Sequence, residues 1–120
     1  MPLFTIDEAR DTLADLLPVL DEIVALRATA TELAADLPHA DGPTPHGGLP
    51  ELKGMHARLD ELMTRVQSTG AELKGFAPLL VDFPSEVDGA PVHLCWLEGD
   101  RALAWYHRQD LGFAGRRPLT

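Results

Sequence analysis

The amino-acid sequence predicts an α+β fold, in which a long antiparallel helical hairpin precedes a small antiparallel sheet of three to four strands. Apolar residues recur at spacings of three and four in residues 6–37 and 49–69, which is the period that packs helices side by side. Beyond Gly70 the apolar residues instead follow the period of two that is typical of strands. At 120 residues the chain has the length of one domain, residues 1–120.

The first helix is expected to begin after Thr5. Thr5 and Glu8 have the spacing of a capping box, in which each side chain accepts a hydrogen bond from the other residue's backbone N–H. Pro18 lies inside this helix, where its missing N–H should produce a kink near Ala14. Arg27 interrupts an otherwise apolar seam, whose members are Ile6, Ala9, Leu13, Leu16, Leu20, Ile23, Ala30, Ala34 and Leu37.

Residues 38–48 contain three prolines and three glycines, so they are expected to form a loop. His39 and His46 lie in this loop, where a metal site is conceivable, but two solvated loop histidines are the favoured interpretation. The second helix is expected over residues 49–69, with Gly70 as its C-terminal stop. Because a flexible loop joins two helices of matching period, we expect them to pair antiparallel.

The sheet is expected within residues 71–107, and residues 108–120 are expected to form an irregular tail. Pro84 should end a strand, and Asp88 with Gly89 should form a turn. The expected strands are residues 71–74, 79–83, 92–97 and 102–106, with the last two joined as a hairpin by residues 98–101.

The composition excludes several classes of function. The formal net charge is −9, and such a surface is repelled by nucleic acid and by anionic membranes. No apolar run reaches the roughly 18 residues of a membrane span, and the first residues do not read as a secretory signal. Cys95 is the single cysteine, which excludes an intramolecular disulfide and a multi-cysteine zinc site. We therefore expect a cytoplasmic protein.

Polar residues that could carry chemistry gather in the C-terminal sheet. Asp82 interrupts an apolar strand, so its carboxylate must be paired, hydrogen-bonded or bound to a metal. His107 follows a strand, and Glu98 and Asp100 lie in the preceding turn. Aspartate, histidine and glutamate at such positions suit a divalent metal or general acid–base catalysis. The candidate metal ligands are therefore Asp82, Glu98, Asp100 and His107.

Each of these residues also has a purely structural explanation. Asp82 could cap the turn at Pro84 or pair with Arg116, and His107 could be a hydrogen-bonded structural histidine. Glu98 and Asp100 could be solvated turn residues.

Cys95 is a second kind of candidate. It fits a small buried hydrophobe; use as a nucleophile would need an adjacent base, and His93 shares its face of the strand. A pocket for a small anionic ligand, which Arg116 would bind in bidentate fashion, has a defined candidate set. Its members are Asp82, Cys95, His107 and Arg116.

Several short motifs occur in the order found in one bacterial and archaeal family. They are Leu80-Val81-Asp82-Phe83-Pro84, Asp88-Gly89, Leu94-Cys95-Trp96, Trp105-Tyr106-His107 and Gly112-Phe113-Ala114-Gly115-Arg116. On these motifs the chain resembles the family called domain of unknown function 2203, over nearly its whole length. The resemblance implies no particular activity. Asp100 stands where this family usually has Glu, and Arg108 where it often has Asp, so a metal site of the family would be weakened or lost here.

Two functions from different classes follow. The first is a ligand- or divalent-metal-binding module with a polar site on the C-terminal sheet. The second is a non-catalytic scaffold that forms a homo-oligomer, most simply a dimer, through its helical hairpin. The sequence does not decide whether the protein is an enzyme.

Overall fold

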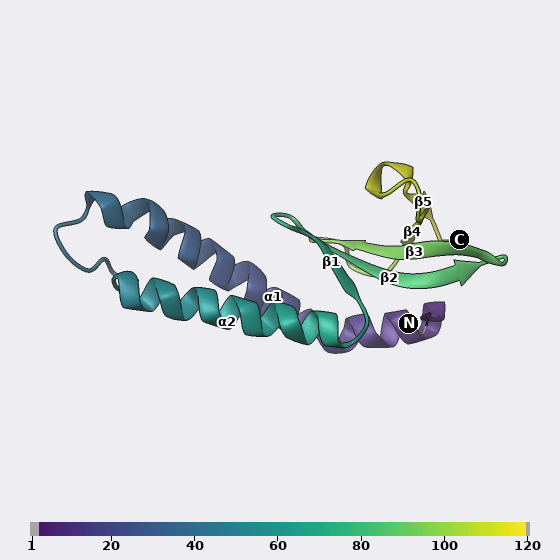
Figure 1. Cartoon of the computed structure of the whole chain (residues 1–120), viewed down its shortest axis with the longest axis horizontal. Coiled ribbons are helices and arrows are strands. Elements are labelled where there is room, and N and C mark those ends of the chain that lie inside the picture. Colours follow the sequence, from purple (N-terminus) through teal and green to yellow (C-terminus); the bar gives the residue numbers. More distant parts are fainter. Residues whose placement is uncertain (1–2, 120) are drawn as a thin grey trace. The chain divides into compact units, whose positions relative to one another are not determined.

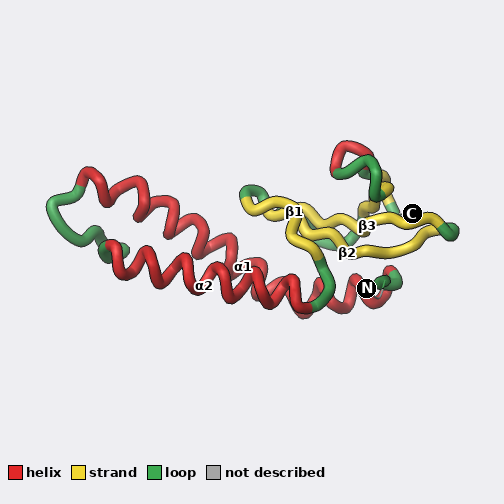
Figure 2. Tube along the Cα trace, viewed as in Figure 1, coloured by secondary structure: helices red, strands yellow, loops and turns green. Residues whose placement is uncertain are grey.

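The computed structural model describes residues 3–119, in which two helices precede a five-stranded sheet (Figures 1 and 2). Helix α1 spans Ile6–Asp36 and α2 spans Leu49–Ser68. The strands are β1 (Glu72–Phe76), β2 (Leu79–Val87), β3 (Ala90–Leu97), β4 (Trp105–Arg108) and β5 (Arg117–Pro118). Every pairing is antiparallel, in the order β1-β2-β3-β4-β5. The α+β class is confirmed, whereas the expected three to four strands were too few.

The chain divides into two compact units. Met1–Leu17 and Val66–Thr120 form the first unit, and Pro18–Arg65 forms the second. Helix α1 continues without interruption through Pro18, where the division falls. Neither described helix has a stretch apolar and long enough to cross a bilayer.

In the second unit, residues of α1 and α2 contact each other. Their buried contacts form a small apolar cluster of Ala30, Leu33 and Leu52, flanked by Leu37 and Met55. On the surface, Arg58 of α2 donates a hydrogen bond of 2.8 Å to Glu22 of α1. A short 3-10 turn, Leu37–His39, opens the connecting loop. In that loop His46 Nε2 lies 3.3 Å from the Glu32 carboxylate.

The predicted helix boundaries rest on visible caps. Glu8 N–H donates to Thr5 Oγ1 at 3.0 Å, and Thr5 N–H donates to Glu8 Oε1 at 2.8 Å, so the capping box is confirmed. Gly70 has a φ of 95°, the left-handed conformation that ends many helices. The predicted ends at residues 37 and 69 each lie one residue beyond the observed ones.

Three details of the sheet were predicted wrongly. Strand β2 continues through Pro84 to Val87, and β4 covers Trp105–Arg108 rather than residues 102–106. The tail contains a 3-10 turn, Phe113–Gly115, and the short strand β5, so it is not wholly irregular. By contrast, the predicted turn at Asp88 and Gly89 is confirmed, and both residues have positive φ, 52° and 79°.

Pro84 is tolerated within β2 because β1 does not extend beside this part of the strand. Strand β1 pairs with β2 only as far as Asp82. At Pro84 the backbone carbonyl accepts a hydrogen bond from Phe4 N–H at 2.8 Å, on the side away from β3. Since the N–H and C=O of one residue in a strand point to the same side, the missing proline N–H removes no bond to β3.

The two faces of the sheet differ in chemistry. One face carries the buried residues Val81, Phe83, Leu94 and Trp96. Phe4, just before α1, packs edge-on against Phe83 with ring centroids 5.3 Å apart, and Arg10 of α1 donates to the Leu103 carbonyl at 3.3 Å. The N-terminal segment therefore lies against the apolar side. The opposite face, which we call the polar face, carries Glu72, Asp82, His93, Cys95, Trp105 and His107.

Candidate metal centre on the polar face of the sheet

The register of the three central strands brings the polar side chains together. Asp82 of β2 is paired with Cys95 of β3, and His93 of β3 is paired with His107 of β4. Residues paired in antiparallel strands project to the same face, as do residues two apart along one strand. Hence these four side chains form one contiguous group on the polar face.

Asp82 and His107 form a buried pair. His107 Nε2 lies 3.2 Å from Asp82 Oδ2, and the side chains of His107 and Asp82 are only 3% and 4% exposed. The other ring nitrogen, Nδ1, lies 2.9 Å from the Arg108 carbonyl oxygen. Because a carbonyl oxygen can only accept, Nδ1 carries a proton. Nε2 then faces the carboxylate either with a second proton, which makes an ion pair, or with a lone pair that a metal ion could bind.

His93 lies beside this pair with its ring centroid 5.3 Å from that of His107. Its Nδ1 is buried and has no hydrogen-bond partner among residues 3–119, and the same holds for Asp82 Oδ1. Its Nε2 lies 3.5 Å from Oε1 of Glu72, which belongs to the edge strand β1 on the other side of β2. Two buried polar atoms without partners in so small a region are unusual in a folded protein.

Asp82, His93 and His107 each offer one ligand atom, and these atoms all lie within 4.8 Å of one another. Zinc lies about 2.0–2.2 Å from nitrogen and carboxylate-oxygen ligands. A metal at the centre would therefore require the three side chains to move slightly closer together.

Cys95 lies within the same group but is chemically quiet. Its side chain is fully buried. Burial, and next the negative charge of Asp82, raise the pKa of the thiol to about 12. The group is therefore a neutral thiol near neutral pH, as expected for a small buried hydrophobe rather than a nucleophile.

The remaining predicted candidates serve the turn after β3. Glu98 Oε1 accepts a hydrogen bond from Leu79 N–H at 2.9 Å. Asp100 Oδ2 accepts one from Leu97 N–H at 2.9 Å and another from Arg116 Nη2 at 2.6 Å. These two acids thus join backbone segments and lie outside the group of three possible ligand residues.

Arg116 holds the C-terminal tail against the sheet. Its guanidinium carbon lies 4.7 Å from the Trp105 ring centroid and 5.0 Å from that of Phe113, in cation–π geometry. Its ion-pair partner is Asp100 rather than Asp82. Of the residues predicted for an anion pocket, the structure joins Asp82 with His107, whereas Arg116 takes part in a separate arrangement.

His93 was missed as a possible ligand by the sequence prediction. It was placed correctly on the face of Cys95, but the expected strand 102–106 ended before His107. With β4 at Trp105–Arg108, His107 lies inside the strand and opposite His93. The sequence did show that His93 and Cys95 project to the same face of their strand. It did not show which residue of β4 is paired with His93, and that pairing is what brings His107 beside it.

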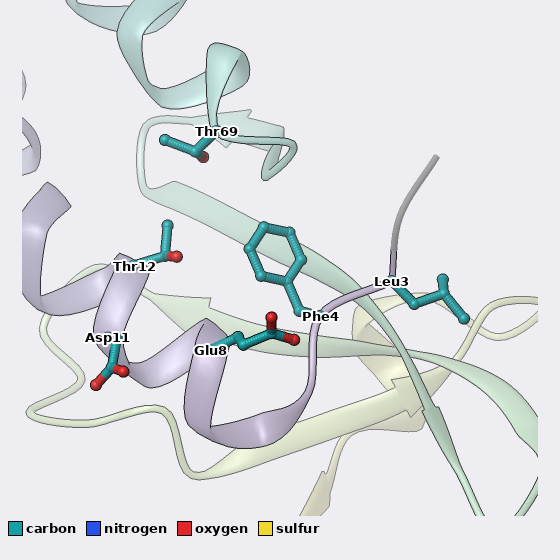
Figure 3. Close-up of a pocket in the computed structure, with 6 residues that line it drawn as sticks. All are labelled: Leu3, Phe4, Glu8, Asp11, Thr12 and Thr69. Carbon is teal, nitrogen blue, oxygen red and sulfur yellow. The ribbon is translucent and has the colours of Figure 1, made fainter.

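A cavity elsewhere in the first unit offers a weaker candidate site. A cavity of about 330 Å³ is lined by Leu3, Phe4, Glu8, Asp11, Thr12 and Thr69 (Figure 3). Figure 3 shows the Phe4 ring lying between Glu8 and Thr69. Glu8 already caps α1, and the Thr69 hydroxyl donates to the Val66 carbonyl at 2.6 Å. These polar groups serve local structure, so the polar face is the better site.

The comparisons with known proteins identify a family. The chain matches the family described as uncharacterized conserved protein (DUF2203) over residues 2–119. Because this match covers nearly the whole chain, the protein belongs to that family, as the sequence motifs indicated. No curated protein and no solved structure shows significant similarity to the chain.

Proposed function

We propose that this member of the DUF2203 family binds a divalent transition-metal ion through Asp82, His93 and His107. The observation that carries the proposal is the buried contact between His107 Nε2 and Asp82 Oδ2. His107 Nε2 faces this carboxylate oxygen at 3.2 Å, while Nδ1 of the same ring lies 2.9 Å from the Arg108 carbonyl oxygen. In metal-free protein a proton on Nε2 would satisfy both atoms and make the contact a buried ion pair. A metal ion could take the place of that proton, held by the Nε2 lone pair and by the carboxylate oxygen.

The chemistry of the three residues suits such an ion. Two imidazoles and one carboxylate are ligands that Zn²⁺ and its first-row neighbours accept. The bond from His107 Nδ1–H to a backbone carbonyl is a common support for a metal-binding histidine. Three protein ligands would leave a coordination position for water or a small ligand, as in catalytic zinc sites. We place this activity in the cytoplasm.

Direct measurement of bound metal tests the proposal. Protein purified without chelator is analysed for its metal content, and metal-free protein is titrated with Zn²⁺ and Co²⁺ by calorimetry. We expect one ion per chain in the wild type and loss of that ion in His93→Ala and in His107→Ala. His56→Ala is the matched control, because His56 is exposed on α2, and this variant should bind as the wild type does.

The controls separate loss of a ligand from loss of the fold. Far-ultraviolet circular dichroism of each metal-free variant shows whether the helices and sheet persist. If folded wild-type protein binds neither ion at micromolar concentration, the proposal is wrong. A proton shared between Asp82 and His107 would then explain their contact.

As a second candidate, we propose a scaffold that dimerises through an antiparallel hairpin of α1 and α2. In its support, Val24 and Leu26 of α1 are only partly buried, and Arg58 and Glu22 join the two helices. A dimer would cover more of this apolar surface. Light scattering after gel filtration distinguishes the states, because a mass of 13.1 kDa at micromolar concentration excludes a stable dimer and twice that mass supports one.

A further inference from the structure

We infer that Glu72 positions His93 for the metal and that the ammonium group of Lys74 limits how firmly it does so. This inference rests on the proposed metal site. A single oxygen, Glu72 Oε1, lies 3.0 Å from Lys74 Nζ and 3.5 Å from His93 Nε2. The same acceptor atom is therefore shared by a lysine and by one of the three proposed ligands.

The strand register places Glu72 at the edge of the polar face. Glu72 of β1 is paired with Asp82 of β2, so its side chain projects beside the proposed ligands. Exposure rises outward from the site, from 12% for the His93 side chain to 35% for Glu72 and 46% for Lys74. Glu72 thus connects a nearly buried imidazole with a lysine that solvent reaches.

Contact with Glu72 determines which nitrogen of His93 is free to bind a metal. A carboxylate can only accept a hydrogen bond, so it favours the proton on the Nε2 that faces it. The lone pair then lies on Nδ1, the buried atom that has no partner among the described residues. A carboxylate on the far nitrogen of a metal-binding histidine orients the ring and makes it a stronger ligand.

Lys74 opposes this support because it competes for the same oxygen. The contact of 3.5 Å between Glu72 and His93 is longer than a good N–H···O hydrogen bond, whereas 3.0 Å to Lys74 is a full one. Without the ammonium group, the Glu72 carboxylate can move closer to His93. Any change that neutralises Lys74 should therefore strengthen metal binding, and this gives the site a point of regulation at the surface.

A double-mutant cycle with Zn²⁺ tests the inference. Glu72→Gln should weaken Zn²⁺ binding on the order of tenfold, since loss of such supporting groups costs about 10–100-fold in affinity. Lys74→Met should strengthen it severalfold. Lys53→Met is the matched control, because Lys53 is an exposed lysine of α2 in the other unit, and it should leave the affinity unchanged.

The double variant distinguishes local competition from a general effect of charge. If Lys74 acts through Glu72, Lys74→Met has no effect in the Glu72→Gln background. If it merely removes a positive charge near the site, its effect persists there, and the inference about Lys74 is wrong. Unchanged affinity in Glu72→Gln would overturn the role of Glu72.

Nitrogen-15 chemical shifts of His93 in metal-free protein give a readout that does not need the metal. The wild type should show the proton on Nε2, and Lys74→Met should increase the share of that tautomer. A proton on Nδ1 in the wild type would overturn the inference by itself. If the wild type carries the proton on Nε2 but binds no Zn²⁺, the proposed function is wrong. The contact between Glu72 and His93 would then be a structural one.

Discussion

Two of the ion pairs among the described residues lie in very different surroundings. In the sheet, His107 and Asp82 approach to 3.2 Å with side chains that are 3% and 4% exposed. In the second unit, Pro18–Arg65, which we call the helical unit, Arg58 and Glu22 approach to 2.8 Å with side chains that are 37% and 45% exposed. The shorter contact is the one that water can replace. Burial, and not distance, therefore decides how much each pair matters to the protein.

The contrast between buried and exposed polar groups also indicates which part of the molecule carries function. A buried polar group without full hydrogen bonding is costly, so a fold retains one only where something else compensates. The polar face keeps Asp82 Oδ1 and His93 Nδ1 in that condition. The Arg58 guanidinium, in contrast, has two carboxylate partners at the surface, Glu22 and Glu61. The sheet carries the unusual chemistry, and the helical surface carries ordinary solvated ion pairs.

The largest effect is expected from breaking the buried pair. His107→Leu in metal-free protein leaves the Asp82 carboxylate buried without a partner, and such a loss typically costs about 3–5 kcal/mol of unfolding free energy. Urea denaturation followed by circular dichroism measures this change. The double variant Asp82→Leu/His107→Leu should recover much of the loss, because replacing both members of a buried pair with apolar groups is often nearly neutral. If His107→Leu is as stable as the wild type, His107 does not stabilise the buried Asp82 carboxylate.

An intermediate effect is expected from Cys95 at alkaline pH. Burial and the charge of Asp82 raise the pKa of this thiol from 9.0 to about 12 in the folded chain. Between these values the unfolded chain binds fewer protons than the folded one, so stability should fall as pH rises from 9 to 12. Cys95→Ala should lack this part of the pH dependence. The stability difference between wild type and variant should therefore narrow over that range in urea denaturation, and a constant difference would contradict the raised pKa.

Much of the fold could be predicted from the sequence because its signals are local. The capping box at Thr5 and Glu8, the stop at Gly70 and the turn at Asp88 and Gly89 each depend on a few neighbouring residues. The alternation within β3 likewise fixes its two faces without reference to other strands. Such features follow directly from backbone chemistry, and the structure reproduces them.

The site was harder to predict because it depends on register between strands. Asp82 and His107 were recognised as candidates, but their contact spans from β2 to β4 and arises only from the observed pairing. Glu98 and Asp100 have suitable chemistry, yet both carboxylates bind backbone N–H groups at the turn. Pro84 misled for the same reason, since its effect depends on whether β1 extends beside it. Single residues reveal chemistry, whereas the distances between them come from tertiary pairing.

The smallest effect is expected from the exposed pair of the helical unit. The hydrogen bond from Arg58 lowers the pKa of Glu22, so any stabilisation is present above the usual pKa of Glu22 and is lost as pH falls through the lowered one. At neutral pH, Arg58→Ala should move the urea midpoint far less than His107→Leu does. Exposed charges are also screened by salt, with a Debye length of about 3 Å at 1 M. The effect of Arg58→Ala should therefore vanish in 1 M NaCl, whereas the effect of His107→Leu persists because salt does not reach a buried pair. If salt changes the effects of Arg58→Ala and His107→Leu on stability equally, burial does not explain the difference between the two pairs.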